Sequence, residues 1–149
     1  MISLRKRQEG FTIVELLIVI VIIGILATLV IVTFTGTQQK ARDSQRQTDI
    51  NAVDSHLESY FAENGYYPDA DDLTGAGAVA FVQANMKGLD PEALKDPKGP
   101  SMQSGAADST HYGYDVTCST PTDRTTCTSF TLTAQLEKDG STYTKKSNT

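Results

Sequence analysis

The apolar residues of this chain are concentrated in one run near the N-terminus, residues 10–32, with the sequence GFTIVELLIVIVIIGILATLVIV. From Leu16 to Gln39 there is no charged residue. As a helix rising about 1.5 Å per residue, this uncharged stretch would be roughly 36 Å long. The hydrocarbon core of a bilayer is about 30 Å thick. The run therefore predicts a helix that can span a membrane, with one carboxylate, Glu15, near its start.

The apolar run continues into a polar stretch and then into an amphipathic one. Apolar residues recur there at spacings of three and four, which is typical of one face of a helix: Ile50, Val53, Leu57, Tyr60 and Phe61. Asn64-Gly65 is a suitable helix end, and Tyr66-Tyr67-Pro68 disfavours continuation. We predict one long helix over about residues 11–63, on the order of 80 Å. Residues 11–34 form its apolar half and residues 35–63 its amphipathic half.

The remaining residues, 64–149, predict a small head. In residues 64–110 we expect a long loop with short helices at 76–87 and after Asp90-Pro91, and a surface loop at 101–109. Two later segments alternate apolar and polar residues with the period of a strand: Tyr112, Tyr114, Val116 and then Phe130, Leu132, Ala134, Leu136. Asp139-Gly140 predicts a hairpin turn. The fold class is α+β, a long helix packed on an antiparallel sheet of about three strands at 111–146.

Charge and cysteine content narrow the possible functions. After Gly10 the chain carries 10 basic and 17 acidic residues, which argues against a general nucleic-acid binder because phosphate contacts need Lys and Arg. The cluster at residues 5–7 (RKR) predicts a cytoplasmic N-terminus. The head would then be exported, where disulfides form. Cys118 and Cys127 bracket eight residues between two predicted strands, so a disulfide there would join the hairpin. The two histidines make no zinc cluster with them.

The residues around the start of the apolar run have a fixed order. A basic leader at 1–10 is followed by Gly10-Phe11-Thr12, two apolar residues, Glu15 and the apolar run, and no A-x-A cleavage site follows that run. This order resembles the class III signal peptide of type IV pilins and pseudopilins. The resemblance implies cleavage between Gly10 and Phe11 by a prepilin peptidase and N-methylation of Phe11. The chain lacks the proline that many major pilins have in this run, so any local melting of the helix is expected near Gly24.

Two interpretations of Glu15 follow. A carboxylate at the edge of hydrocarbon is costly and is a functional candidate by default, whereas an acid at a helix N-terminus is simply favourable. The family resemblance favours the first, with Glu15 pairing with the amino terminus of a neighbouring subunit during assembly. A second feature is the order of charges along the predicted helix after the apolar run, where the basic residues Lys40, Arg42 and Arg46 come before several acidic residues. It indicates either contact between axially shifted subunits or a solvated helix face.

Cofactor sites are only weakly indicated. Asp69, Asp71 and Asp72 are expected in a solvated loop. Pseudopilin heads can bind calcium in a C-terminal loop, but Asp96, Asp108 and Asp115 lack a regular calcium-loop spacing. Calcium is therefore implied only by the resemblance to pseudopilins, and no other cofactor is expected. No nucleophile–base constellation can be named, so we expect no enzyme.

Together these features predict a structural subunit, a major or major-like pilin that polymerises into an extracellular type IV pilus for adhesion, twitching motility or DNA uptake. Its expected partners are further copies of itself in a helical filament, the prepilin peptidase and the assembly ATPase and platform. It would cross the inner membrane once before assembly and lie on the cell surface afterwards. One alternative is a pseudopilin of a type II secretion-like system. Another is a membrane-anchored binding module that does not polymerise and would not need Glu15.

Overall fold

The computed structural model describes residues 10–120 and 123–148, without the side chains of Val32 and Thr33. The chain divides into two compact units, Met1–Thr37 and Gln38–Thr149, which are described separately. Residues 1–9 of the predicted leader, which covers residues 1–10, lie outside the described residues.

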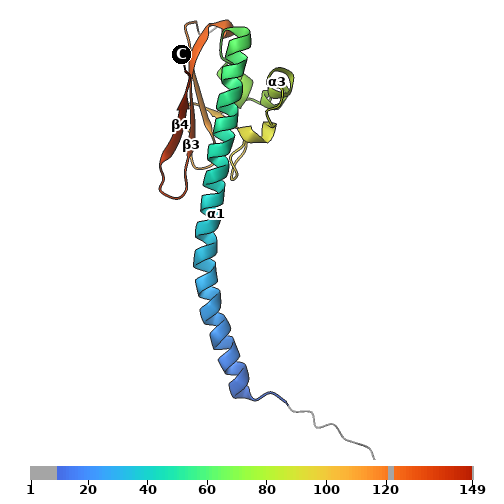
Figure 1. Cartoon of the computed structure of the whole chain (residues 1–149), viewed down its shortest axis with the longest axis vertical. Helices are drawn as coiled ribbons and strands as arrows, with labels where there is room; N and C mark the ends of the chain where they lie inside the picture. The colour runs from blue at the N-terminus through green and yellow to red at the C-terminus, as the bar shows by residue number, and fades with distance from the viewer. Residues whose placement is uncertain (1–9, 121–122, 149) are drawn as a thin grey trace, which may run out of the picture. The chain divides into compact units, whose positions relative to one another are not determined.

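The helix α1, Ile13–Asn64, extends through both units (Figure 1). It agrees with the predicted helix to within two residues at its start and one at its end. In the single chain it runs without interruption through Gly24, the position at which any local melting on assembly is expected. It ends as the sequence predicts, because Gly65 has a positive φ of 82° and its N–H donates to the Phe61 carbonyl at 2.7 Å.

In the first unit the apolar side chains of α1 are exposed all around the helix. Leu17, Val19 and Ile22, for example, are each about half exposed. Within the described residues, this helix is the one that is long and apolar enough to cross a membrane. Two threonine hydroxyls in this unit donate to backbone carbonyls about one turn back, Thr28 to Ile25 and Thr35 to Ile31. Such bonds satisfy the hydroxyls within the helix itself.

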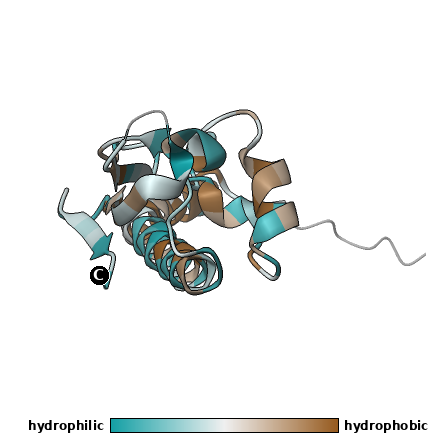
Figure 2. Cartoon of the chain, turned by 90° about the horizontal axis from the view of Figure 1, so that it is seen from above, coloured by the Kyte–Doolittle hydropathy of each residue, from teal (hydrophilic) through white to brown (hydrophobic). Residues whose placement is uncertain are grey.

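The second unit packs short helices and a sheet on the rest of α1. After α1 come α2 (Ala70–Thr74), α3 (Ala78–Asn85) and the 3₁₀ helix η1 (Pro91–Leu94). The sheet elements follow as β1 (Gln103–Ser104), β2 (Gly113–Cys118), the 3₁₀ helix η2 (Arg124–Thr126), β3 (Cys127–Gln135) and β4 (Thr142–Lys146). In the two views, β3 and β4 lie on one side of α1 and α3 lies on the other (Figures 1 and 2).

The sheet differs from the predicted one in its first strand. Its order is β1-β2-β3-β4, with β2, β3 and β4 antiparallel as predicted and β1 parallel to β2. The predicted antiparallel sheet of about three strands at 111–146 is therefore confirmed as β2, β3 and β4. The expected surface loop at 101–109 contains one additional strand, which is parallel and was not predicted. The strand is held by bonds from Gln103 N–H to the Tyr112 carbonyl and from Gly105 N–H to the Tyr114 carbonyl, both 2.9 Å. Two residues are too few to show alternation in the sequence.

The core of the head lies between α1 and the sheet. The predicted helix face of Ile50, Val53 and Leu57 is fully buried, as are Tyr112 and Tyr114 of the sheet side. Burying one such aliphatic side chain stabilises a fold by about 1.5–3 kcal/mol. The periodic sequence pattern thus identified both faces of the core correctly.

Candidate assembly segment and charged cluster

The predicted cleavage site lies in exposed, non-helical backbone. Gly10 and Phe11 precede the first residue of α1, and the Phe11 side chain is 91% exposed. The peptide bond between them is therefore accessible to another protein.

Thr12 and Glu15 cap the start of α1 reciprocally. The Glu15 N–H donates to Thr12 Oγ1 at 3.2 Å, while the Thr12 N–H and hydroxyl donate to Glu15 Oε2 at 2.9 and 2.7 Å. This is a capping box, in which two otherwise unpaired helix donors are satisfied. Sequence reasoning overlooked it, although the Thr-x-x-Glu spacing before an apolar run is its signature.

The capping box fixes Glu15 without neutralising it. Its donors in the described residues are a backbone N–H and a hydroxyl, both uncharged. No ion pair involves Glu15 within residues 10–120 and 123–148. A cation from another molecule would therefore find the carboxylate at a defined position with its charge uncompensated.

A second feature of the molecule is a buried cluster around Arg46 in the head. The Arg46 side chain is fully buried and forms a bidentate pair with Asp96, Nε to Oδ2 at 2.6 Å and Nη2 to Oδ1 at 2.9 Å. Its Nη1 donates to Asp43 Oδ1 at 3.0 Å and to Glu137 Oε1 at 2.8 Å. One guanidinium thus joins α1, the segment after η1 and the β3–β4 turn. The bonds to Asp96 raise the pKa of Arg46, which stays charged.

Glu137 forms ion pairs with two further cationic side chains. Arg42 forms a second bidentate pair with it at 2.7 Å for both bonds, and Lys98 Nζ lies 2.6 Å from Oε2. The bonds from Arg42 hold the pKa of Glu137 well below its ordinary value. Asp43 additionally accepts the N–H groups of Glu137 and Lys138 at 2.8 and 3.0 Å. The β3–β4 turn is therefore fastened to α1 by charged side chains.

This cluster corrects the prediction for the charges of the helix. Arg42 and Arg46 were expected to contact another subunit or to face solvent. Both instead bind carboxylates of their own chain, and Arg46 is fully buried. Only Asp43, at helical spacing from Arg46, could have been anticipated, because the partners Asp96 and Glu137 are 50 and 91 residues away in the sequence.

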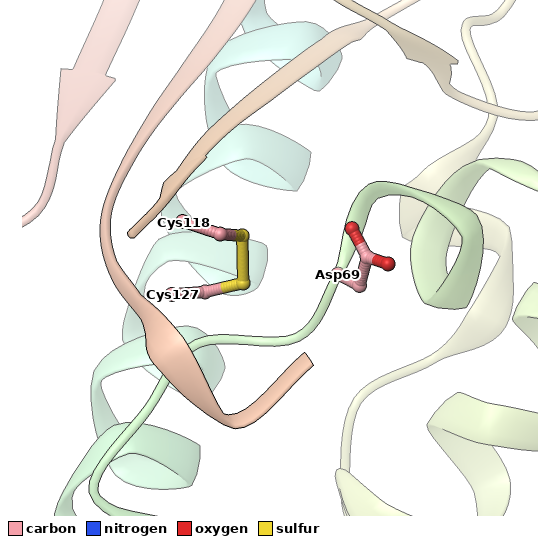
Figure 3. A group of neighbouring side chains, drawn as sticks. All are labelled: Asp69, Cys118 and Cys127. Atoms are coloured by element: carbon pink, nitrogen blue, oxygen red, sulfur yellow. A yellow bond between two sulfur atoms is a disulfide. The ribbon is translucent and has the colours of Figure 1, made fainter. Parts of the chain in front are cut away.

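Cys118 and Cys127 form a disulfide, as predicted, and they pair directly across β2 and β3. Figure 3 shows the bond with the side chain of Asp69 facing it from the segment before α2. Its carboxylate and the two sulfurs lie within 4.8 Å of one another. Because the sulfurs are bonded to each other, they are not available as thiolate ligands for a metal. In this state the group is a structural link within the head.

The acidic residues expected in a solvated loop are mostly engaged in local structure. Asp69 and Asp72 form a capping box on α2, and Arg124 lies 2.8 Å from Asp72. The acids considered for calcium do not meet: Asp96 pairs with Arg46, Asp108 lies 3.0 Å from the His111 ring, and Asp115 is exposed on β2. Among the described residues these carboxylates form no common site.

The fold and the N-terminal segment together define a class of protein. A long helix with an exposed apolar half, a capped glutamate near its start and a small head with a sheet are features of a pilin-like subunit. The family profile described as Prokaryotic N-terminal methylation motif matches residues 5–31.

Similar proteins narrow the class. The chain is 33% identical over 135 residues to type II secretion system core protein G of Vibrio cholerae, which covers 91% of this chain and 86% of that protein. It is 36% identical over 92 residues to the protein of the same name from Aeromonas hydrophila, where the match spans only 62% of each chain. Type IV major pilin protein PilA of Myxococcus xanthus is 40% identical over 65 residues, 44% of this chain and 30% of PilA. No solved structure matches. The chain belongs to the type IV pilin-like family, which includes type II secretion system core protein G.

Proposed function

We propose that this protein is a pseudopilin, a structural subunit that polymerises within a type II secretion-like system. The observation that carries the proposal is the similarity to core protein G over 91% of the chain, head included. The similarity to PilA covers only 44% of the chain. The sequence alone had favoured the subunit of an extracellular pilus, with the pseudopilin as the alternative, and the order of these two functions is now reversed.

The proposed cycle begins in the membrane. The apolar half of α1 anchors the subunit, and a prepilin peptidase cuts between Gly10 and Phe11 and methylates Phe11. The new amino group is a cation at the start of a neighbouring subunit, and Glu15 offers an uncompensated carboxylate. Pairing of the two would remove both charges from the apolar centre of a filament and set the axial register. Apolar helices gain little by exchanging lipid for one another, so an ATP-driven machine would supply the work of extraction. The role is structural and needs no catalytic residues.

The test compares Glu15→Ala with Glu63→Ala, an exposed acid at the other end of α1. Mass spectrometry of the mature N-terminus measures processing, and filaments are counted after overexpression of the subunit. We expect both variants to start at methylated Phe11 but only Glu15→Ala to lose filaments. Normal filaments from Glu15→Ala would refute the pairing, and a chain that still starts at Met1 would refute the processing.

A second candidate is a major pilin of an extracellular type IV pilus, which the similarity to PilA favours. Deletion of the gene separates the two. A pseudopilin is needed for protein export, whereas a major pilin is needed for long surface fibres and for the adhesion, motility or DNA uptake that depend on them. If the chain never polymerises in either assay, the remaining candidate is a membrane-anchored binding module.

A further inference from the structure

Two lysines at the beginning of the head lack an ion-pair partner within the described residues. Lys40 and Lys138 are exposed, and no carboxylate lies within 4.0 Å of either ammonium there. They line the same groove, of about 350 Å³, together with Ser44, Gln47 and Leu136. We propose that this groove binds the phosphate of an anionic phospholipid headgroup while the subunit is anchored in the membrane. The proposal rests on the anchored state that precedes assembly in the proposed function.

The backbone and the nearby acids are arranged so that the two lysine charges remain available. The N–H of Lys138 is held by Asp43 Oδ2 at 3.0 Å, which fixes the residue beside α1. Asp43 also lines the groove, but its charge is compensated by the ion pair with Arg46. Asp139 also lines the groove, and its carboxylate accepts the N–H and hydroxyl of Ser141 at 3.0 and 2.7 Å. Two lysines against one remaining acid leave the groove with a net positive charge, although residues 38–149 carry 10 basic and 16 acidic residues.

The position of Lys40 along the helix matches the level of lipid headgroups. From Ile13 to Phe34 the apolar stretch is about 33 Å long as a helix, close to the thickness of a hydrocarbon core, about 30 Å. The headgroup layer adds about 5–8 Å on each side. Lys40 is the first charged residue after Glu15, and it follows Phe34 by about 9 Å of helix. A lysine can extend its ammonium toward the headgroups from such a position, and basic residues next to a membrane segment attract anionic lipid.

The groove binds lipid rather than the acidic surface of a second copy. Lys40 lies six residues after the apolar stretch, whereas Arg42 and Arg46, two and six residues further along the helix, are used within the head. Attraction to a charged membrane surface extends about one Debye length, about 10 Å at 0.1 M salt. Lys40, six residues after the apolar stretch, is within the range of such a surface, and Lys138 lines the same groove.

The experiment uses the full mature chain, unassembled, in nanodiscs of phosphatidylcholine with and without phosphatidylglycerol. A neutral acetylating reagent labels lysines, and mass spectrometry measures the rate at each one. We expect phosphatidylglycerol to slow the labelling of Lys40 and Lys138 several-fold, to leave Lys87 and Lys146 unchanged, and to lose its effect at high salt. Equal slowing at all four lysines, or none at Lys40 and Lys138, would overturn the proposal.

Matched variants test the same surface by affinity. Native mass spectrometry counts the lipids retained by Lys40→Gln/Lys138→Gln and by Lys87→Gln/Lys146→Gln, which have the same net charge. The first pair should lose about tenfold in its preference for phosphatidylglycerol over phosphatidylcholine, since each lysine near an anionic surface contributes, and the second pair should keep it. If the lysines instead bind a second copy, protection will be independent of lipid and will arise only on assembly, which overturns the lipid proposal. A subunit that selects phosphatidylglycerol but never forms filaments would refute the proposed function and leave this inference intact.

Discussion

Arg46 offers the sharpest test of how the head is held together. Replacing it with Met keeps much of the side-chain volume and removes the charge. Asp96, which is almost fully buried, would lose both bonds from the guanidinium and keep only the N–H of Lys98 at 2.8 Å. Asp43 would keep two backbone donors, and Glu137 would keep Arg42 and Lys98. The loss therefore falls mainly on Asp96.

The expected magnitude follows from that uncompensated carboxylate. Removing one partner of a buried ion pair costs about 3–5 kcal/mol of unfolding free energy. Arg46→Lys keeps the charge but cannot form the bidentate pair, so its cost should be intermediate. Arg124→Met is the control, because Arg124 is about half exposed where it meets Asp72. An exposed pair of this kind contributes about 0–1 kcal/mol.

The assay is urea unfolding of the full chain in detergent, followed by tyrosine fluorescence. Adding Asp96→Asn to Arg46→Met removes the orphaned charge and should restore about 1–3 kcal/mol of the lost stability. Two results would contradict the reasoning. One is a cost for Arg46→Met no larger than that for Arg124→Met. The other is a double variant less stable than Arg46→Met alone.

Three further predictions concern other sites. Thr12→Val, which removes the cap from α1, should lower the local stability of the helix start by about 1 kcal/mol and speed amide hydrogen exchange at Glu15. Thr12→Ser, which keeps the hydroxyl, should do neither. Equal exchange rates at Glu15 in the two variants would exclude the cap. Glu137 has a lowered pKa, so its contribution to stability is complete above the unfolded pKa of about 4.3 and is lost as pH falls toward the folded value. Glu137→Gln should therefore flatten the acid limb of a stability–pH curve, and an unchanged limb would argue against the cluster. Reduction of the Cys118–Cys127 disulfide should lower the unfolding free energy by about 2–3 kcal/mol, as measured by urea unfolding with and without reductant. An unchanged unfolding free energy would mean that the disulfide does not stabilise the head.

The sequence by itself determined the features that depend on local spacing. The apolar run, the 3- and 4-residue period of Ile50, Val53 and Leu57, and the Asn64-Gly65 end predicted α1 closely. The period-two pattern located β2 and β3. The same local order of glycine, aromatic residue and acid pointed to the pilin-like family before any fold was known. These features can be read from the sequence because each depends on residues only a few positions apart.

The tertiary structure decided which charges face each other. In the sequence, Arg46 looked like one cation in a basic stretch, and nothing marked Asp96 and Glu137 as its partners. The fold brings them together because the β3–β4 turn and the segment after η1 meet the same turns of α1. The pairing in turn leaves Lys40 and Lys138 as the available cations at the start of the head. The two-residue strand β1 was invisible for a related reason, since it exists only through hydrogen bonds to β2. Contacts between distant residues depend on the folded arrangement, and a single sequence carries no local signal for them.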